Sequence, residues 1–168
     1  MLETIKDFFS LEMIYQFANI GVIPLWLLII FVPNSKITNG LINNLFIPFI
    51  LALTYGYLVY EQINPSGTFT SILKQDSYPL LDNFKLYLGL NYLMSLMDNT
   101  LFVLIFWIHF LTLSLFLGIW IAQDAIKLNI HKYIVIFPLI LTYFTGPIGL
   151  FLYLFLRLLI AQRVKLFD

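Results

Sequence analysis

The chain has 168 residues, of which 61% are hydrophobic and only 11% are charged. About a quarter of the residues in a soluble domain are charged, because its surface must face water. This composition therefore excludes an ordinary soluble globule and predicts a protein surrounded by lipid. The formal net charge is zero and there is no cysteine, which argues against nucleic acid as a partner and excludes disulfides and thiolate metal sites.

The N-terminal segment is not expected to be a cleaved signal peptide. It carries acidic and basic side chains together, Glu3, Lys6 and Asp7, and no small-residue cleavage site follows the first apolar stretch. That stretch should therefore remain in the protein as a membrane anchor.

Four apolar stretches are each predicted to cross the membrane as a helix. They cover residues 17–33, 41–60, 100–122 and 133–160. A span needs roughly 20 apolar residues, and only a helix satisfies the backbone of such a segment in lipid. The expected fold class is all-α, an integral membrane bundle of about four transmembrane helices in a single domain, 1–168.

The segment 82–97, between the second and third stretches, is apolar but too short to span the membrane. We predict a short interfacial or re-entrant helix there. The alternative is that these residues extend the third span at its N-terminal end.

The third stretch carries His109 near its middle, far from either end, and ionisable groups at membrane depth are candidates for function. On a helical period Asp98, His109 and Trp120 share one face, which should point into the bundle. Three further residues fall near the same arc: Thr112, Phe116 and Asp124. The alternative role for His109 is a hydrogen bond to a neighbouring helix.

The fourth stretch carries a row of small and polar residues at helical spacing: Pro138, Thr142, Gly146, Gly149, Tyr153 and Arg157. Small residues in such a row let helices pack closely, and Pro147 should kink this helix. If this helix lies antiparallel to the third, Gly146 and Pro147 come level with His109. Asp98 then comes level with Arg157, which predicts an ion pair that is structural rather than catalytic.

The distribution of Lys and Arg predicts the orientation. With four spans, one side holds Lys6, Lys74, Lys85, Arg157, Arg163 and Lys165, and the other holds Lys36, Lys127 and Lys132. Both termini are therefore expected in the cytoplasm, and the membrane is expected to be a bacterial inner membrane or a photosynthetic one.

No soluble-enzyme motif is present, and there are only two histidines, so metal catalysis through a histidine cluster is not expected. Three segments instead suggest a family: Trp107-Ile108-His109 with Gly118-Ile119-Trp120-Ile121 and Asp124-Ala125; Pro24-Leu25-Trp26 with Pro33-Asn34; and Gly146-Pro147-Ile148-Gly149 with Tyr153 and Arg157. They resemble the first, third and last helices of the abscisic-acid-deficient-four family, which includes plant neoxanthin synthases. The resemblance covers residues 19–157.

The resemblance implies a cofactor-free isomerase that acts inside the membrane on an epoxy-carotenoid or a related isoprenoid. Such a reaction needs one acid and one base, and His109 is the first candidate because imidazole serves in either role. The second catalytic group is left open among Asp98, Asp124 and Tyr143. The residues expected to line the substrate slot are Trp26, Trp107, Trp120, Thr112, Phe116, Gly146, Pro147, Gly149 and Tyr153.

Two other functions fit the same sequence. A non-catalytic pigment- or lipid-binding subunit of a larger membrane assembly would explain the small size and the many aromatic residues. A small transporter would normally show an inverted repeat, which is not evident. The expected partners are membrane lipids and a hydrophobic small molecule such as a carotenoid, and the stripes of Gly and Ala permit self-association.

Overall fold

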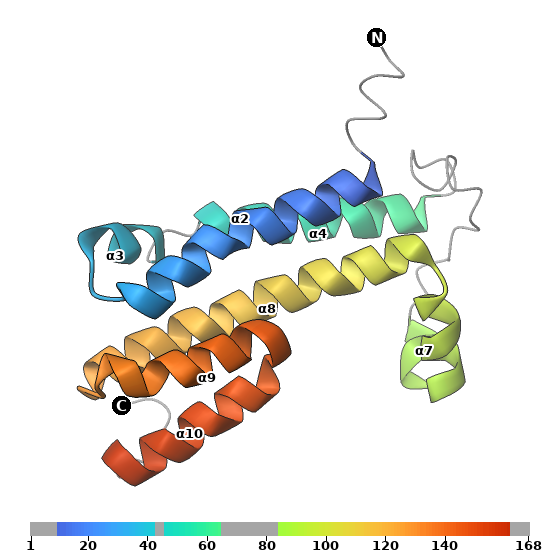
Figure 1. Ribbon diagram of the computed structural model, residues 1–168. Coiled ribbons are helices and arrows are strands. Elements are labelled where there is room, and N and C mark those ends of the chain that lie inside the picture. The colour runs from blue at the N-terminus through green and yellow to red at the C-terminus, as the bar shows by residue number, and fades with distance from the viewer. Residues whose placement is uncertain (1–9, 43–45, 65–83, 162–168) are drawn as a thin grey trace. The chain divides into compact units, whose positions relative to one another are not determined.

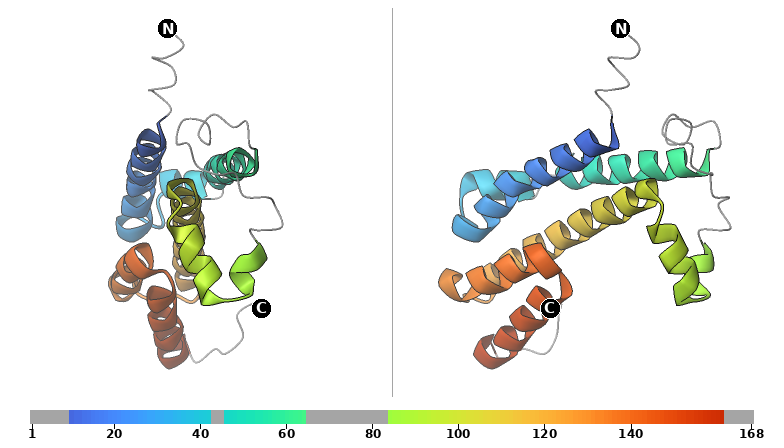
Figure 2. Two further views of the ribbon diagram at one scale, coloured as in Figure 1. Left: turned by 90° about the vertical axis from the view of Figure 1, so that its right-hand side faces the viewer. Right: turned by 45° about the vertical axis from the view of Figure 1, so that its right-hand side comes forward.

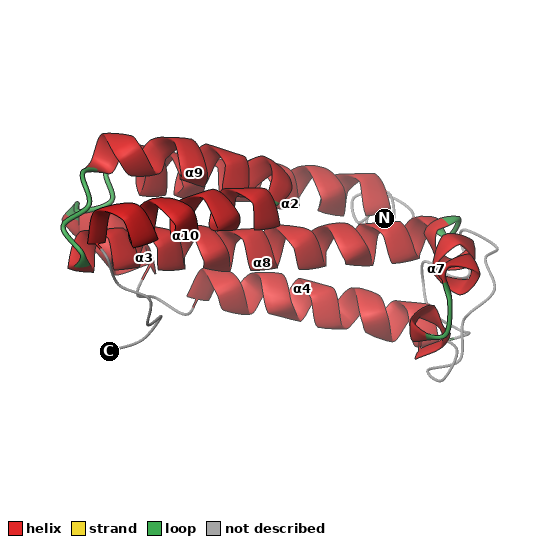
Figure 3. Ribbon diagram, turned by 90° about the horizontal axis from the view of Figure 1, so that it is seen from below, coloured by secondary structure: helices red, strands yellow, loops and turns green. Residues whose placement is uncertain are grey.

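A computed structural model describes residues 10–42, 46–64 and 84–161. Every regular element in these residues is helical, and none is a strand (Figure 3). The elements are α2 (Leu11–Phe31), α3 (Lys36–Ile42), α4 (Phe46–Ile63), the 3-10 helix η1 (Phe84–Tyr87), α7 (Leu90–Met97), α8 (Thr100–Lys127), α9 (Lys132–Thr145) and α10 (Pro147–Ala161) (Figure 1). The all-α class is therefore confirmed for this part of the chain.

Two of these helices, α2 and α8, are long and apolar enough to cross a membrane. They have 21 and 28 residues, with mean hydropathies of 1.9 and 2.3. They match the first and third predicted stretches. The second stretch overlaps α4, which has 18 residues and continues to Ile63, and α3 ends within the first residues of that stretch.

The fourth stretch was predicted as one kinked helix, and this is wrong: it forms two helices, α9 and α10. Gly146 adopts φ +60°, a left-handed value that residues with a Cβ rarely take. Its N–H bonds the carbonyl of Thr142 at 2.9 Å and closes α9. Pro147, which has no N–H to satisfy, then begins α10. The chain therefore reverses at this point, and α9 and α10 lie side by side in both views of Figure 2.

Gly149 allows the two arms of this helical hairpin to approach closely. A Cβ on Gly149 would collide with the backbone nitrogen and hydroxyl oxygen of Thr142, and would lie 2.6 Å from the carbonyl oxygen of Pro138. The row of small residues in the fourth stretch thus packs α10 against α9.

The segment before α8 forms η1 and α7, within the range where a short helix was predicted; residues 82 and 83 lie outside the described residues. It is not an extension of α8, because the helical structure is interrupted at Asp98 and Asn99. The side-chain Oδ1 of Asn99 accepts a hydrogen bond from the backbone N–H of Phe102 at 3.0 Å. Asn99 therefore caps a new helix.

The chain divides into two compact units, and α2 and α8 each contribute to both. The first lies within Met1–Ala18 and Phe49–His109, and the second within Asn19–Pro48 and Phe110–Asp168. In the first unit, ring pairs link α2 to α8 and α4 to α8: Tyr15 with Trp107 and Tyr55 with His109. The second unit contains the C-terminal parts of α2 and α8 together with α3, α9 and α10.

Candidate functional site

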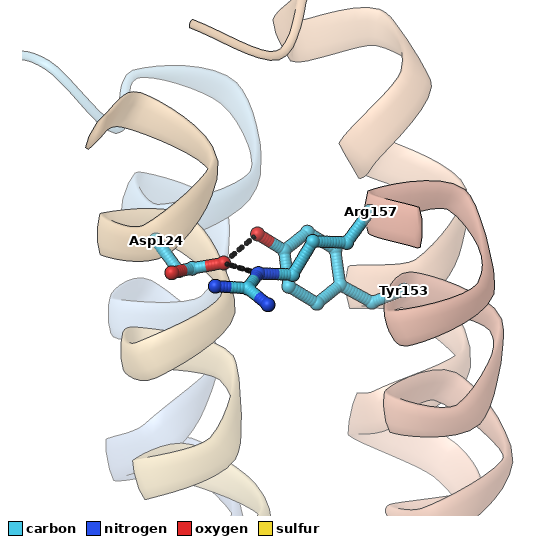
Figure 4. Close-up of polar contacts among 3 residues, drawn as sticks. All are labelled: Asp124, Tyr153 and Arg157. Carbon is cyan, nitrogen blue, oxygen red and sulfur yellow. Dashed lines mark hydrogen bonds and ion pairs between the residues drawn. The ribbon is translucent and has the colours of Figure 1, made fainter. Parts of the chain in front are cut away.

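A buried cluster of three polar side chains lies in the second unit, between α8 and α10 (Figure 4). The hydroxyl of Tyr153 donates to Oδ2 of Asp124 at 2.6 Å. Nε of Arg157 donates to the same oxygen at 2.7 Å and forms an ion pair with it. The exposed fractions are 8% for Asp124, 0% for Tyr153 and 4% for Arg157. This cluster therefore combines a proton donor, a proton acceptor and a fixed positive charge.

The two chain reversals bring these residues together. Because α9 returns along α8 and α10 reverses again, α10 runs in the same direction as α8. Tyr153 and Arg157 are four residues apart and share one face of α10. On the facing side of α8, Trp120 lies one turn before Asp124, and its ring meets that of Tyr153 edge-on, with centroids 5.8 Å apart.

The predicted ion pair between Asp98 and Arg157 is wrong, because the carboxylate partner of Arg157 is Asp124. The prediction counted residues along one uninterrupted fourth helix, which would carry Arg157 to the far end of α8. The turn at Gly146 brings it back toward the end where α8 finishes. Asp98 is exposed, at the C-terminal end of α7.

The expectation that Asp98 and His109 both point into the bundle interior is also wrong, because both are exposed. His109 lies in the first unit, and its ring centroid is 5.8 Å from that of Tyr55 at a tilt of 45°. Its role as an acid or base stays a prediction. The same holds for Asp98.

Trp26 and Tyr143, two other predicted site residues, lie together in the second unit. Their ring centroids are 5.4 Å apart in an edge-on arrangement. Trp26 fits over Gly118, where a Cβ would lie 2.5 Å from the indole ring. The indole Nε1 is buried and has no hydrogen-bond partner among the described residues, which makes it an available donor for a ligand oxygen.

The remaining predicted slot residues belong to both units, and their role in a substrate slot stays a prediction. Trp107 packs against Tyr15 in the first unit, with ring centroids 5.9 Å apart. Thr112 is half-buried and Phe116 is 49% exposed. Gly146, Pro147 and Gly149 form the turn and the packed face of the hairpin.

The sequence analysis placed Tyr153 and Arg157 in one row of the fourth stretch and Asp124 on the third stretch, but it did not bring Asp124 together with the other two. The signal that could have grouped them is Gly146 followed directly by Pro147, a pair that ends one helix and begins another. No three His, Asp or Glu side chains are grouped for a metal ion in the part of the chain that the structure describes.

Comparisons with known proteins gave one family. The family described as ABA DEFICIENT 4-like matches residues 13–153, which is most of the chain. A comparison with curated proteins found no significant match. A comparison with solved structures also found none.

Proposed function

Because the chain belongs to the ABA DEFICIENT 4-like family, we propose that it is an integral membrane isomerase that acts, without a cofactor, on an epoxy-carotenoid or a related isoprenoid. The family relates the chain to neoxanthin synthase-like proteins. The observation that supports the chemistry is the buried contact between the Tyr153 hydroxyl and the Asp124 carboxylate.

The proposed reaction converts an epoxide beside a polyene into an allenic alcohol. A proton joins the epoxide oxygen and the carbon–oxygen bond breaks, while the neighbouring polyene carbon loses a proton. The product has the same atoms as the substrate, and no electrons are gained or lost. The reaction therefore needs one acid and one base, held in a site without water.

Tyr153 and Asp124 can supply this acid and this base. Tyr153 gives its proton to the epoxide oxygen, and Asp124 takes the proton from carbon. The proton on Asp124 then returns to Tyr153 along their 2.6 Å hydrogen bond, which restores both groups. The net charge of the cluster stays constant throughout, and Arg157 balances the negative charge in both states.

The substrate must displace a side chain to reach the cluster, because Tyr153 is fully buried. Trp120 meets the Tyr153 ring edge-on and is only half-buried. We therefore propose that Trp120 gives way to the ring end of the substrate. Trp26 contributes a second feature, a buried indole N–H that has no partner in the described part of the chain and can bind a substrate hydroxyl.

The test is pigment chromatography of a host that makes epoxy-carotenoids and expresses this chain. A new isomer, absent from the empty-vector control, is expected. Tyr153→Phe and Asp124→Asn should each lower its formation by about 100-fold or more, since a positioned acid or base contributes roughly 10²–10⁴. Tyr60→Phe, at an exposed tyrosine, is the matched control and should retain the activity at equal protein levels.

His109→Gln separates the two catalytic assignments. Full activity in this variant together with loss in Tyr153→Phe supports the buried cluster. The reverse pattern would move the chemistry to the first unit, where His109 lies beside Tyr55.

The second candidate function is a pigment- or lipid-binding subunit without catalysis. It is favoured by one observation, that Asp124 is already bonded to two side chains, as in a purely structural clasp. Unchanged pigment that copurifies with the chain, with no new isomer in the extract, would support this function over the isomerase.

A further inference from the structure

The second unit contains a pocket that the cluster of Asp124, Tyr153 and Arg157 does not use. It has a volume of about 350 Å³ and lies where α2 and α8 end and α9 begins. It is lined by Ile29, Ile30, Pro33, Asn34, Ala122, Ala125, Ile126, Asn129, Ile130, His131, Lys132, Val135 and Leu139.

Two alanines on α8 leave this space open. Ala122 and Ala125 lie on the same face of α8 as Gly118, three or four residues apart. At Gly118 the ring of Trp26 fills the gap between the helices. Farther along α8, small side chains stand opposite Ile29 and Ile30, and the gap stays unfilled. Asp124, Tyr153 and Arg157 do not line the pocket, so it is separate from the polar cluster.

The polarity of the pocket changes from its walls to its mouth. Its buried lining is apolar and includes Ile29, Ala125, Val135 and Leu139. Its polar lining residues, Asn34, Asn129, His131 and Lys132, are all exposed. Lys132 is the one charged residue among the lining residues that the structure describes, and none of these residues is acidic.

We propose that this pocket binds an anionic membrane lipid, with one acyl chain against the apolar wall and the headgroup at Lys132. The volume is at the small end of the range for ligand pockets, about 300–1,000 Å³, so it takes part of one chain rather than a whole diacyl lipid. Lys132 also begins α9, whose N-terminal end adds partial positive charge at the mouth. The inference requires the chain to lie in a membrane but does not rest on the isomerase.

The pocket opens where lipid headgroups would lie. Asn34, Asn129 and His131 belong to the connections after α2 and α8, and Lys132 is the first residue of α9. Among the described residues, α2 and α8 are the helices long enough to cross a bilayer. Helix ends of such spans meet the headgroup region. A lysine at this depth attracts anionic lipids, while a zwitterionic headgroup gains little from it.

The experiment measures thermal unfolding of the purified full chain in detergent, titrated with phosphatidylglycerol or with phosphatidylcholine. Phosphatidylglycerol should raise the unfolding temperature, and phosphatidylcholine should have a much smaller effect. In Lys132→Gln the apparent affinity for phosphatidylglycerol should fall about five-fold, the effect of one charge at a membrane surface. Lys127→Gln, which removes an exposed charge outside the pocket, should leave the affinity unchanged.

A second pair of variants tests the pocket itself. Ala125→Leu fills the space beside Ile29 and should abolish the stabilisation by phosphatidylglycerol. Ala52→Leu adds the same side chain at an exposed position and should not. Copurified lipid, identified by mass spectrometry, gives a readout that holds even if a variant is less stable.

The other outcomes would overturn the proposal. Equal stabilisation by both lipids would mean that Lys132 does not select the headgroup. An equal loss in Lys127→Gln would indicate general surface charge instead of a site. Stabilisation by inorganic phosphate alone, at the same concentration, would identify a free-anion site and not a lipid site.

Discussion

Oδ2 of Asp124 accepts hydrogen bonds from the hydroxyl of Tyr153 and from Nε of Arg157, and all three side chains are buried. Removing one partner of the ion pair between Asp124 and Arg157 lowers the stability strongly, because the other partner then stays charged and buried. Replacing both partners with apolar side chains removes this problem. The three residues therefore depend on one another for stability as well as for any chemistry.

Asp124→Asn should lower the free energy of unfolding by about 3–5 kcal/mol, since Arg157 would remain charged without its carboxylate. The double variant Asp124→Leu with Arg157→Met should be less destabilised than Asp124→Asn alone. Denaturant unfolding in detergent measures both. Asp98→Asn, at an exposed position, is the matched control and should change stability by less than about 0.5 kcal/mol. Equal losses in the single and double variants would contradict the ion pair as the cause.

Gly118 determines the packing of Trp26 in a way that a single substitution can test. Gly118→Ala would place a Cβ 2.5 Å from the indole ring, and overpacking of this kind costs about 1–3 kcal/mol. Gly21→Ala is the matched control, because a Cβ there meets nothing within 4 Å and alanine favours the helix. The unfolding temperature should fall in Gly118→Ala and rise slightly in Gly21→Ala. An unchanged unfolding temperature in Gly118→Ala would contradict the tight contact with Trp26.

At the scale of elements, most helices could be predicted from the apolar stretches, but the direction of the last one could not. Gly146 and Pro147 were identified as a break and interpreted as a kink. Hydropathy cannot separate a kinked helix from a hairpin, because either one buries the same apolar residues. The backbone conformation of Gly146 determines that the stretch forms a hairpin, and the only sign of this conformation in the sequence is the proline that follows.

The site residues show the same limit. Asp124, Tyr153 and Arg157 were each recognised as candidates, but the error at Gly146 gave Arg157 the wrong partner. His109 was expected inside because a charged group is costly in lipid, yet it is exposed beside Tyr55. Helical periodicity indicates which residues share a face, and it does not say which neighbour that face meets.

The hairpin itself can be tested at Gly146. Alanine at this position would have to adopt φ +60°, at a cost of roughly 1–2 kcal/mol. Gly146→Ala should therefore unfold at a lower temperature than the parent chain, and Gly56→Ala, where a Cβ meets nothing within 4 Å, should not. A Gly146→Ala protein of unchanged stability would argue against the left-handed turn.

At the scale of the whole molecule, the hairpin changes the expected membrane topology. With 14 and 15 residues, α9 and α10 are each about 21–23 Å long, shorter than the roughly 30 Å of a bilayer core. If the hairpin lies in a membrane, we therefore expect α9 and α10 to enter and leave it on the same side. If α2, α4 and α8 each cross, the two ends of the chain then lie on opposite sides.

This topology changes which side of the membrane each Lys and Arg is assigned to. The predicted topology assigns Lys36, Lys127, Lys132, Arg163 and Lys165 to one side and Lys6, Lys74 and Lys85 to the other. Arg157 is buried and is left out of this count. For this topology the positive-inside rule predicts that the C-terminal end lies in the cytoplasm. This topology replaces the assumption of a fourth crossing, on which the expectation of two cytoplasmic termini depended.

Single cysteines can test this topology, since the chain has none of its own. With a membrane-impermeant thiol reagent, cysteines replacing Lys127 and Lys165 should be labelled from the same side, and one replacing Lys6 from the other. Labelling of the Lys127 and Lys165 positions from opposite sides would show that α9 and α10 together cross the membrane.

The ion pair between Asp124 and Arg157 also sets an order of events during biosynthesis. The two residues are 33 positions apart, so Asp124 leaves the ribosome roughly 2–7 s before Arg157 at ordinary elongation rates. If α8 inserts into the membrane during that interval, the Asp124 carboxylate is still without Arg157. A chain that ends before Arg157 would keep Asp124 without this partner, so we expect it to be degraded faster than the full chain.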